Sequence, residues 1–352
     1  MSTSRVTNVT LELIKKITGD FSEKKRIGSG GYGEVFKGVL NGDEIAIKKL
    51  FPVHGLDDEA FDNEFRNLMK VEHKNVVQLI GYCYEISHRH TEYNGQLVFA
   101  KVIDRALCFE YMQGGSLVKH ISAESCIHDW PTTYKIIKGT CEGLHYLHKG
   151  RGEKNYIYHL DLKPDNVLLD KNMVPKIGDF GLSRLFGESK THQTSTTRGT
   201  IGFMPPEFIN NRMMSAKNDV FSLGVIIFYI MAGEKGYNDY CDLRLRPESL
   251  DKSRQEFVES VQMYWKKKMQ ATAAYTWHEE DLLGVTKCME IAMSCVDTDR
   301  AKRPTTEEFI GDLNKLEAEI EKMSKKITKS VVGQDNWDFK KDIAVDPPME
   351  LR

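Results

Sequence analysis

The most informative segment of this 352-residue chain reads His159-Leu160-Asp161-Leu162-Lys163-Pro164-Asp165-Asn166, followed by Val167-Leu168-Leu169 and then by Asp179-Phe180-Gly181. It sets the carboxylates of Asp161 and Asp179, an amide and a lysine in two short polar loops that apolar, strand-like segments connect. Carboxylate and amide oxygens are ligands that suit Mg²⁺, and a further carboxylate can accept a proton from a hydroxyl group. The spacing therefore predicts a site for phosphoryl transfer.

Each of these polar residues has a distinct predicted role. Asp161 is expected to orient and deprotonate the attacking hydroxyl, and Lys163 to neutralise charge on the transferring group. Asn166 and Asp179 are the predicted Mg²⁺ ligands. The alternative is an ordinary polar turn, because Asp, Asn and Pro are common turn residues. The Asp-Phe-Gly that follows at a suitable distance disfavours that alternative.

A glycine-rich segment lies upstream and reads Gly28-Ser29-Gly30-Gly31-Tyr32-Gly33. A dinucleotide-binding fingerprint of this spacing should follow a strand and open a helix. Here the glycines run into two apolar strands, residues 35–40 and 44–48, on either side of an Asn-Gly-Asp turn. Glycines between two strands let backbone N–H groups approach phosphates closely. A phosphate-covering loop is the favoured interpretation, and an ordinary glycine turn is the alternative.

Glu64 lies on the apolar face of a helix predicted over residues 56–70, beside Phe61 and Phe65. A buried carboxylate is costly unless a cation meets it. Lys48, at the end of the second strand, is the expected partner, and a lysine held in this way can bind the α- and β-phosphates of a nucleotide. The alternative is a surface lysine and an unrelated glutamate.

The remaining pattern divides the chain into a small strand-rich part and a larger helical part, with a hinge near residues 110–115. A helix is predicted over residues 10–18, strands over 76–82 and 106–111, and a polar extended loop over 87–96. Helical spacing then dominates residues 134–148, 220–232, 257–269, 282–294 and 305–329. The predicted fold class is α+β.

Composition argues against several classes of protein. The formal net charge of −2 gives no reason to expect nucleic acid or an anionic membrane as a partner. The longest apolar run, residues 220–231, is too short to span a bilayer and is predicted as a buried helix. The start of the chain lacks the apolar core of a signal peptide. Seven scattered cysteines without a Cys-x-x-Cys pair are typical of reduced thiols in a cytosolic protein.

The chain resembles a eukaryotic protein kinase over residues 21–314, and in detail the plant receptor-like and receptor-like cytoplasmic kinases, relatives of the Pelle-type kinases. Four stretches carry the finer resemblance: Asp20-Phe21-Ser22, His73-Lys74-Asn75-Val76-Val77-Gln78-Leu79-Ile80-Gly81-Tyr82-Cys83, Glu110-Tyr111-Met112-Gln113-Gly114-Gly115-Ser116-Leu117 and Gly143-Leu144-His145-Tyr146-Leu147-His148. The resemblance implies a two-lobed fold, with an N-lobe at residues 21–112, a C-lobe at 113–314 and ATP at the hinge between them.

The resemblance also implies which residues contact ATP. Phe109 would occupy the gatekeeper position, and the backbones of Glu110 and Met112 would contact the nucleotide. Lys163 with Gly199-Thr200 is similar to serine/threonine kinases rather than to tyrosine kinases. The implied ATP-binding residues are Ile27, Gly28, Ser29, Gly30, Gly31, Tyr32, Gly33, Val35, Ala46, Lys48, Glu110, Met112 and Leu168.

Leu160 stands where many kinases carry an arginine that pairs with a phosphate on the activation loop. Leucine cannot form that pair, so activity is expected to depend only weakly on loop phosphorylation. The class without this arginine is often linked in plants with immune signalling. By resemblance the activation segment covers residues 179–207, Glu207 pairs with Arg303, and Asp219 braces the catalytic loop. Hydroxyl residues crowd that segment and are either autophosphorylation sites or ordinary solvated residues: Ser189, Thr191, Thr194, Ser195, Thr196 and Thr197.

Residues 315–352 are predicted as a helical extension and tail. Apolar residues recur there and just before at steps of four and three: Phe309, Leu313, Leu316, Ile320, Met323 and Ile327. Packing of the last kinase helix is the favoured interpretation and a dimerising coiled coil is the alternative, because the seam covers under three heptads. The final ten residues, 343–352, are similar to the first strand of a major sperm protein domain, which would make this chain a fragment of a longer protein.

The sequence therefore predicts a serine/threonine protein kinase that uses ATP and Mg²⁺ and has a lead-in helix within residues 1–20. It is expected to be cytoplasmic or held at the plasma membrane by a partner. Its expected substrate is a protein, and an upstream receptor or immune complex is expected to control its activity. No transmembrane segment and no nucleic-acid partner are expected. Two other classes are disfavoured. A pseudokinase scaffold or decoy would not need all six catalytic groups, and a Rossmann-type oxidoreductase would have a helix after the glycines.

Overall fold

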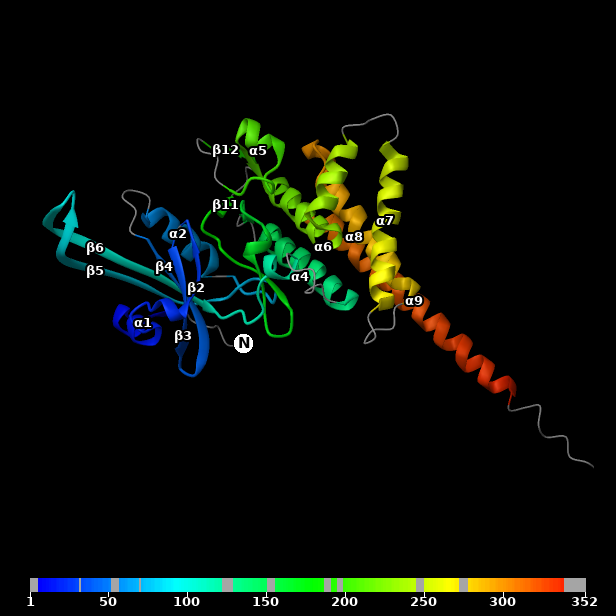
Figure 1. The fold of residues 1–352 in the computed structure, drawn as a ribbon, viewed down its shortest axis with the longest axis horizontal. Helices are drawn as coiled ribbons and strands as arrows, with labels where there is room; N and C mark the ends of the chain where they lie inside the picture. Colours follow the sequence, from blue (N-terminus) through cyan, green and yellow to red (C-terminus); the bar gives the residue numbers. More distant parts are fainter. Residues whose placement is uncertain are drawn as a thin grey trace, which may run out of the picture.

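The computed structural model describes residues 6–31, 33–51, 57–69, 71–121, 129–150, 156–186, 191–194, 199–244, 250–271 and 278–338. It has a β-rich N-lobe and a helical C-lobe, so the predicted two-lobed α+β fold is confirmed (Figure 1). Tyr32, four of the six hydroxyl residues of the activation segment (Ser189, Ser195, Thr196 and Thr197) and the 343–352 tail lie outside the described residues.

The N-lobe is built on a six-stranded sheet in the order β1-β5-β6-β4-β3-β2. Its strands are β1 (Thr7–Asn8), β2 (Arg26–Gly30), β3 (Gly33–Leu40), β4 (Asp43–Leu50), β5 (Leu79–Tyr93) and β6 (Gln96–Glu110). Asn41 and Gly42, between β3 and β4, have φ of 54° and 94°, the left-handed values that a type I′ hairpin turn requires. A strand follows the glycine-rich segment, so the dinucleotide-binding alternative is wrong.

Two helices pack against this sheet. The predicted lead-in helix is α1 (Leu11–Thr18), which the side chain of Thr10 caps by accepting a hydrogen bond from Leu13 N. Its residue Ile14 is buried in a small core with two β4 residues, Ile45 and Ile47. The second helix is α2 (Asp57–Leu68), and its apolar face joins the main core that also fills the C-lobe. The sheet thus holds α2 at the boundary between the lobes.

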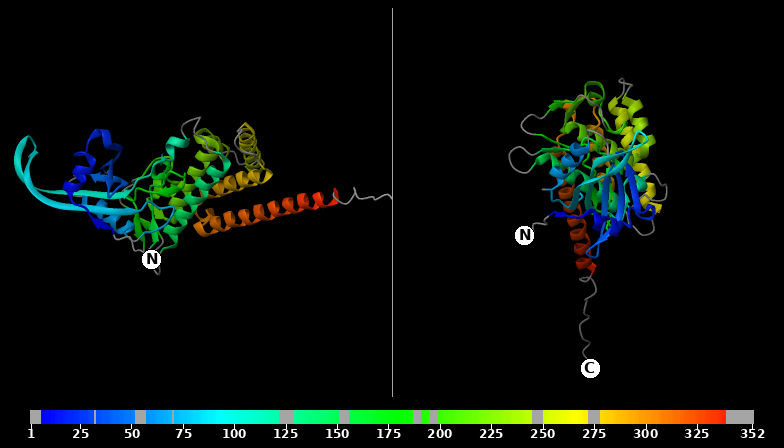
Figure 2. Two further views of the ribbon diagram at one scale, coloured as in Figure 1. Left: turned by 90° about the horizontal axis from the view of Figure 1, so that it is seen from below. Right: turned by 90° about the vertical axis from the view of Figure 1, so that its left-hand side faces the viewer.

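The β5–β6 hairpin shows that the prediction of a polar loop over residues 87–96 is wrong. The two strands pair residue by residue from Gly81 and Cys108 out to Tyr93 and Gln96. Between them Asn94 and Gly95 have φ of 51° and 75° and form a second Asn-Gly turn. The hairpin curves away from the rest of the N-lobe (Figure 2). Outside the core, neither face of these strands needs to be apolar, so the alternation that marks a half-buried strand is weak there.

The C-lobe is mainly helical. Its helices are α3 (Val118–Ile121), α4 (Trp130–Lys149), α5 (Pro206–Asn211), α6 (Ala216–Arg244), α7 (Leu250–Ala271), α8 (Glu279–Cys295) and α9 (Thr306–Asp338). Short strands are β7 (Gly115–Ser116), β8 (Tyr156–Tyr158), β9 (Val167–Leu169), β10 (Pro175–Ile177), β11 (Arg184–Phe186), β12 (Thr191–Gln193) and β13 (Met213–Ser215). Strands β9 and β10 pair with each other and hold the two predicted catalytic loops on either side of one hairpin.

Helix α6 is the central helix of the C-lobe. By length and composition alone it is apolar enough to cross a membrane, but 67% of its most apolar window is buried inside the protein. Ten of the twelve residues from Val220 to Met231 are buried, as the sequence predicts for a core helix. The backbone leaves helical geometry at Gly233, where φ is 72°, so the apolar part ends there.

Helix α9 begins in the core and then leaves it. Phe309 and Leu313 are fully buried, whereas Met323 is 36% exposed. Figure 2 shows the later turns of α9 projecting beyond the C-lobe. The first turns therefore fit the packing interpretation of the apolar seam, and the coiled-coil dimer stays a prediction. The side chain of Ile327 lies outside the described part of the seam.

The six described cysteines form no disulfide with one another, and five of them are buried. Burial raises the pKa of four thiols to about 12: Cys83, Cys108, Cys288 and Cys295. These residues therefore act as small apolar core side chains.

Candidate active site

The first predicted loop folds so that its polar side chains face one another. Asp161 Oδ1 accepts a hydrogen bond of 2.9 Å from the Thr200 hydroxyl, and Lys163 Nζ donates to the same hydroxyl at 2.8 Å. Lys163 Nζ lies 3.3 Å from Asp161 Oδ2. Asn166 Nδ2 donates to the backbone oxygen of Asp161 at 2.8 Å. A carboxylate, an ammonium and an amide are thus fixed around a position where a hydroxyl group already binds.

Asp219, in the first turn of α6, holds this loop from behind. Its two carboxylate oxygens accept hydrogen bonds of 2.7 Å from the backbone amides of His159 and Leu160, and His148 Nε2 lies 2.8 Å from Oδ2. The contact that the resemblance implies is therefore present. Leu160 has φ of 63°, a left-handed conformation that leucine rarely adopts. The hydrogen bonds that the backbone amides donate to Asp219 hold the backbone in this strained geometry.

Lys48, Glu64 and Asp179 meet at the interface of the lobes. Lys48 Nζ donates to both oxygens of Glu64, at 3.1 and 2.8 Å, and to Asp179 Oδ1 at 2.6 Å. Glu64 is only 1% exposed, as its place on the apolar helix face predicts. The contact between Lys48 and Asp179 joins the N-lobe to the second predicted loop. Sequence spacing alone did not indicate it, because 131 residues separate the two side chains.

The charges of these groups depend on one another. Burial alone would lower the pKa of Lys48, but the carboxylates of Asp179 and Glu64 outweigh it and raise that pKa. Burial alone would raise the pKa of Asp179, but the Lys48 ammonium outweighs it and holds that pKa below its ordinary value. Lys48 and Asp179 are therefore both charged at neutral pH.

The segment after Asp179 is tied to α2 through Asn67 and Ser183, which sequence analysis missed, and through the predicted packing residue Phe180. Phe180 is fully buried and packs edge-on against the ring of His159, with centroids 5.0 Å apart. Ser183 Oγ donates to Phe180 O at 2.7 Å and accepts from Asn67 Nδ2 at 2.6 Å. The available signal was a polar residue, Asn67, on the side of α2 that also buries Glu64. This chain of contacts couples the position of α2 to the loop that carries Asp179.

The glycine-rich segment forms the end of β2, the following turn and the start of β3. A Cβ atom on Gly33 would lie 2.2 Å from the backbone oxygen of Lys49, so only glycine fits there. Three of the predicted nucleotide-contacting side chains, Val35, Ala46 and Leu168, are partly buried, and Ile27 is 43% exposed.

At the hinge, the carboxylate of Glu110 forms hydrogen bonds with other residues of the protein. It accepts hydrogen bonds from Gln78 N at 2.8 Å and from Lys176 Nζ at 2.7 and 2.8 Å. The amide of Glu110 donates to Gln78 O at 3.2 Å, and Met112 O accepts from Gly115 N at 3.0 Å. These bonds fix the course of the hinge, and contact of its remaining backbone groups with ATP stays a prediction.

The donor atoms fit a divalent ion that is shared with a nucleotide. Among the described residues no group of three or more His, Cys, Asp or Glu side chains could hold a metal ion. Asn166 uses its amide nitrogen toward Asp161, which leaves its oxygen as the metal-binding atom. One carboxylate and one amide oxygen suit Mg²⁺, which is usually bound by one or two carboxylates together with substrate phosphates.

The activation segment ends at a buried ion pair. Arg303 donates to the two carboxylate oxygens of Glu207 at 2.7 and 2.8 Å, and its side chain is fully buried. This is the pair that the resemblance implies. Of the predicted autophosphorylation residues, Thr191 and Thr194 lie in the described part of the segment, Thr191 in β12 and Thr194 just after it.

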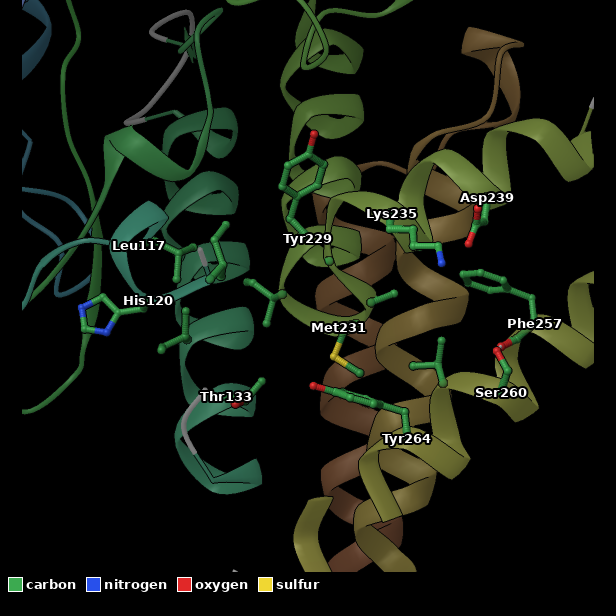
Figure 3. Close-up of a pocket in the computed structure, with 17 residues that line it drawn as sticks. Leu117, His120, Thr133, Tyr229, Met231, Lys235, Asp239, Phe257, Ser260 and Tyr264 are labelled. Atoms are coloured by element: carbon green, nitrogen blue, oxygen red, sulfur yellow. The ribbon is translucent and has the colours of Figure 1, made fainter. Parts of the chain in front are cut away.

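A separate pocket of about 400 Å³ lies within the C-lobe (Figure 3). Residues of α3, α4, α6 and α7 surround it, and Met231, Phe257 and Tyr264 contribute much of its apolar wall. None of the predicted site residues lines this pocket. It is therefore no part of the constellation around Asp161.

Comparison with known proteins agrees with this geometry. Residues 21–312 match the protein kinase domain. The chain is 34% identical over 332 residues to cysteine-rich receptor-like protein kinase 44 of Arabidopsis thaliana, which covers 88% of this chain and 77% of that protein. It is also 34% identical over 316 residues to cysteine-rich receptor-like protein kinase 29 of the same plant, covering 84% of this chain but 41% of the relative.

A third relative is a G-type lectin S-receptor-like serine/threonine-protein kinase of Arabidopsis thaliana, 34% identical over 302 residues, which cover 84% of this chain and 34% of that protein. The chain thus spans less than half of the second and third relatives. The matched region contains all six residues of the constellation described above. This chain belongs to the protein kinase family, and its relatives are receptor-like serine/threonine kinases of plants.

Proposed function

We propose that this chain transfers the γ-phosphoryl group of ATP to serine or threonine hydroxyls of a protein substrate. The observation that carries the proposal is the contact of Lys48 with both Glu64 and Asp179, at 2.6 to 3.1 Å. This arrangement joins a strand of the N-lobe, a helix of the N-lobe and a loop of the C-lobe. In protein kinases the lysine–glutamate pair and the Asp-Phe-Gly aspartate must both be in place for catalysis.

Each side chain has a role that its surroundings support. Asp161 orients the substrate hydroxyl and accepts its proton, as the hydrogen bond from the Thr200 hydroxyl illustrates. Lys163 is held beside that hydroxyl and offsets negative charge on the transferring group. Lys48 binds the α- and β-phosphates. Asn166 and Asp179 hold Mg²⁺, which neutralises charge on the phosphates when bound.

The contacts of Thr200 support the choice of substrate hydroxyl. Thr200 itself bonds to Asp161 and Lys163 through an aliphatic hydroxyl at 2.9 and 2.8 Å. A substrate serine or threonine presents the same group to the same two side chains.

Replacing Lys48 by Met tests this function. We expect phosphate transfer from labelled ATP to a generic protein substrate to fall roughly 10²- to 10³-fold, as it does when one preorganised electrostatic group is removed. The matched control is Lys49→Met, because the ammonium of Lys49 lies over the Phe21 ring, 4.1 Å from its centroid, and away from Glu64. Lys49→Met should stay close to the unmodified chain. If the unmodified chain binds ATP but transfers no phosphate, the protein is a pseudokinase scaffold instead.

Activity should depend only weakly on phosphorylation of the activation segment. Leu160 is 9% exposed and apolar, so it offers no charge that could order a phosphorylated loop. Alanine replacement of the hydroxyl residues from Thr191 to Thr197 should leave most of the transfer rate, measured with the same labelled-ATP assay. A near-total loss of activity in that variant would contradict this expectation.

The setting of the reaction is inferred from the relatives. Their names describe receptor-like kinases, so we infer that this chain acts in plant signalling or defence, under an upstream receptor or immune complex. Its place would be the cytoplasm or the inner face of the plasma membrane, where a partner holds it. Fractionation of plant cells that express the tagged chain, with and without detergent, tests that location.

A further inference from the structure

A second pocket, of about 530 Å³, lies behind the catalytic loop, and its largely apolar wall carries several charged side chains. Cationic residues from three different elements line it: Lys149 at the end of α4, Lys217 in the first turn of α6, and Arg300 before α9. Among the described lining residues Glu307 is the one carboxylate. The volume is in the range of small-molecule sites. Because cationic side chains outnumber carboxylates in the lining, we expect an anionic ligand.

The helices that border this pocket add to its preference for anions. Ala216, the first residue of α6, and Thr306, the first residue of α9, both line it. The start of a helix presents backbone N–H groups and the positive end of the helix dipole. Two such ends and three cationic side chains therefore converge on one cavity.

The surroundings of Lys217 show that its charge is incompletely balanced within the protein. Its ammonium donates to the backbone oxygen of Arg303. Burial lowers the pKa of Lys217, and the guanidinium groups of Arg303 and Arg300 act in the same direction, against the carboxylate of Glu308. A bound anion would stabilise the charged form of Lys217.

Two described strands of the activation segment, β11 and β12, pair with residues that line this pocket. Phe186 of β11 pairs with Tyr156, and Thr191 of β12 pairs with Ser215, and both partners line the pocket. A phosphorylated residue of this segment is therefore one nearby source of an anion. A soluble phosphate ester is the other source.

We propose that the pocket formed by Lys149, Lys217 and Arg300 is a phosphoryl-binding site, separate from the ATP cleft. Its ligand is a phosphate monoester, either on the activation segment of this chain or on a soluble molecule. Arginine and lysine bind such groups through short, charge-assisted hydrogen bonds. Binding of phosphate to this pocket does not depend on the proposed phosphoryl transfer, and only the experiment that identifies the source of the phosphate rests on that activity.

The test measures binding of inorganic phosphate to the full chain by titration calorimetry, after phosphatase treatment and with the ATP cleft filled by a non-hydrolysable ATP analogue. We expect saturable binding at physiological salt. Arg300→Gln and Lys149→Gln should each weaken it roughly 10-fold, since one hydrogen bond to a charged group contributes about that factor. Lys302→Gln is the matched control and should bind as the unmodified chain does, because Lys302 is exposed and does not line the pocket.

The source of the phosphate is decided by the same titration on the autophosphorylated chain. If the activation segment supplies the phosphoryl group, the pocket is filled and added phosphate no longer binds. If the ligand is a soluble ester, both forms bind phosphate equally. No saturable binding to the treated chain, or equal binding by Arg300→Gln, Lys149→Gln and the unmodified chain, would overturn the proposal.

Discussion

Replacing Asp161 by Asn should lower the rate of phosphoryl transfer roughly 10²- to 10⁴-fold, the contribution typical of a positioned general base. Asparagine has nearly the same shape, so it keeps a hydrogen-bonding oxygen toward the hydroxyl that Thr200 now occupies. It cannot accept the substrate proton. ATP affinity should change little, because the proposed phosphate-binding side chain, Lys48, contacts Glu64 and Asp179 rather than Asp161.

Asp165→Asn is the control for this prediction. Asp165 lies four residues further along the same loop and is exposed, so its loss should leave the rate almost unchanged. The measurements are the turnover rate with labelled ATP and the dissociation constant of ATP. An Asp161→Asn variant with nearly full turnover would show that Asp161 is not the base.

The second large effect concerns stability. Replacing Arg303 by Met should reduce the free energy of unfolding by about 3–5 kcal/mol, as is typical when one member of a buried ion pair is removed. Arg303 is fully buried and donates to Glu207 through two nitrogens, to Asp297 O at 2.7 Å and to Lys217 O at 3.1 Å. Without it the carboxylate of Glu207, only 12% exposed, has lost its charge partner.

A double-mutant cycle in urea unfolding separates this cause from simple loss of packing. Arg303→Met combined with Glu207→Gln should recover part of the lost stability, because no unpaired charge then stays buried. Lys302→Met, at the exposed neighbouring position, should have little effect. Strictly additive effects of the Arg303 and Glu207 substitutions would mean that the ion pair does not account for the loss.

Several contacts were predictable from the sequence because local physics places them. Helical spacing places Glu64 on the face that carries Phe61 and Phe65, and a buried carboxylate needs a cationic partner. Lys48, at the end of a hairpin strand, is close enough to be that partner. The Asn41-Gly42 turn followed from its residue types. The arrangement of Asp161, Lys163 and Asn166 within eight residues followed from their proximity in one loop.

Other features depend on tertiary structure that no local pattern encodes. The contact of Lys48 with Asp179 and that of Asn67 with Ser183 join segments 131 and 116 residues apart. The β5–β6 hairpin was missed for a different reason. Beyond the core its exposed side chains need not alternate, so the Asn94-Gly95 pair was the one strong local indicator of the turn.

Burial of the cysteines determines how their thiols react with alkylating reagents and oxidants. Nucleophilic attack by cysteine needs the thiolate, and burial keeps Cys83, Cys108, Cys288 and Cys295 protonated, with pKa values raised to about 12. At neutral pH these four positions should be poor targets for alkylating reagents and peroxide. Oxidants should therefore leave the core packing around these four side chains intact.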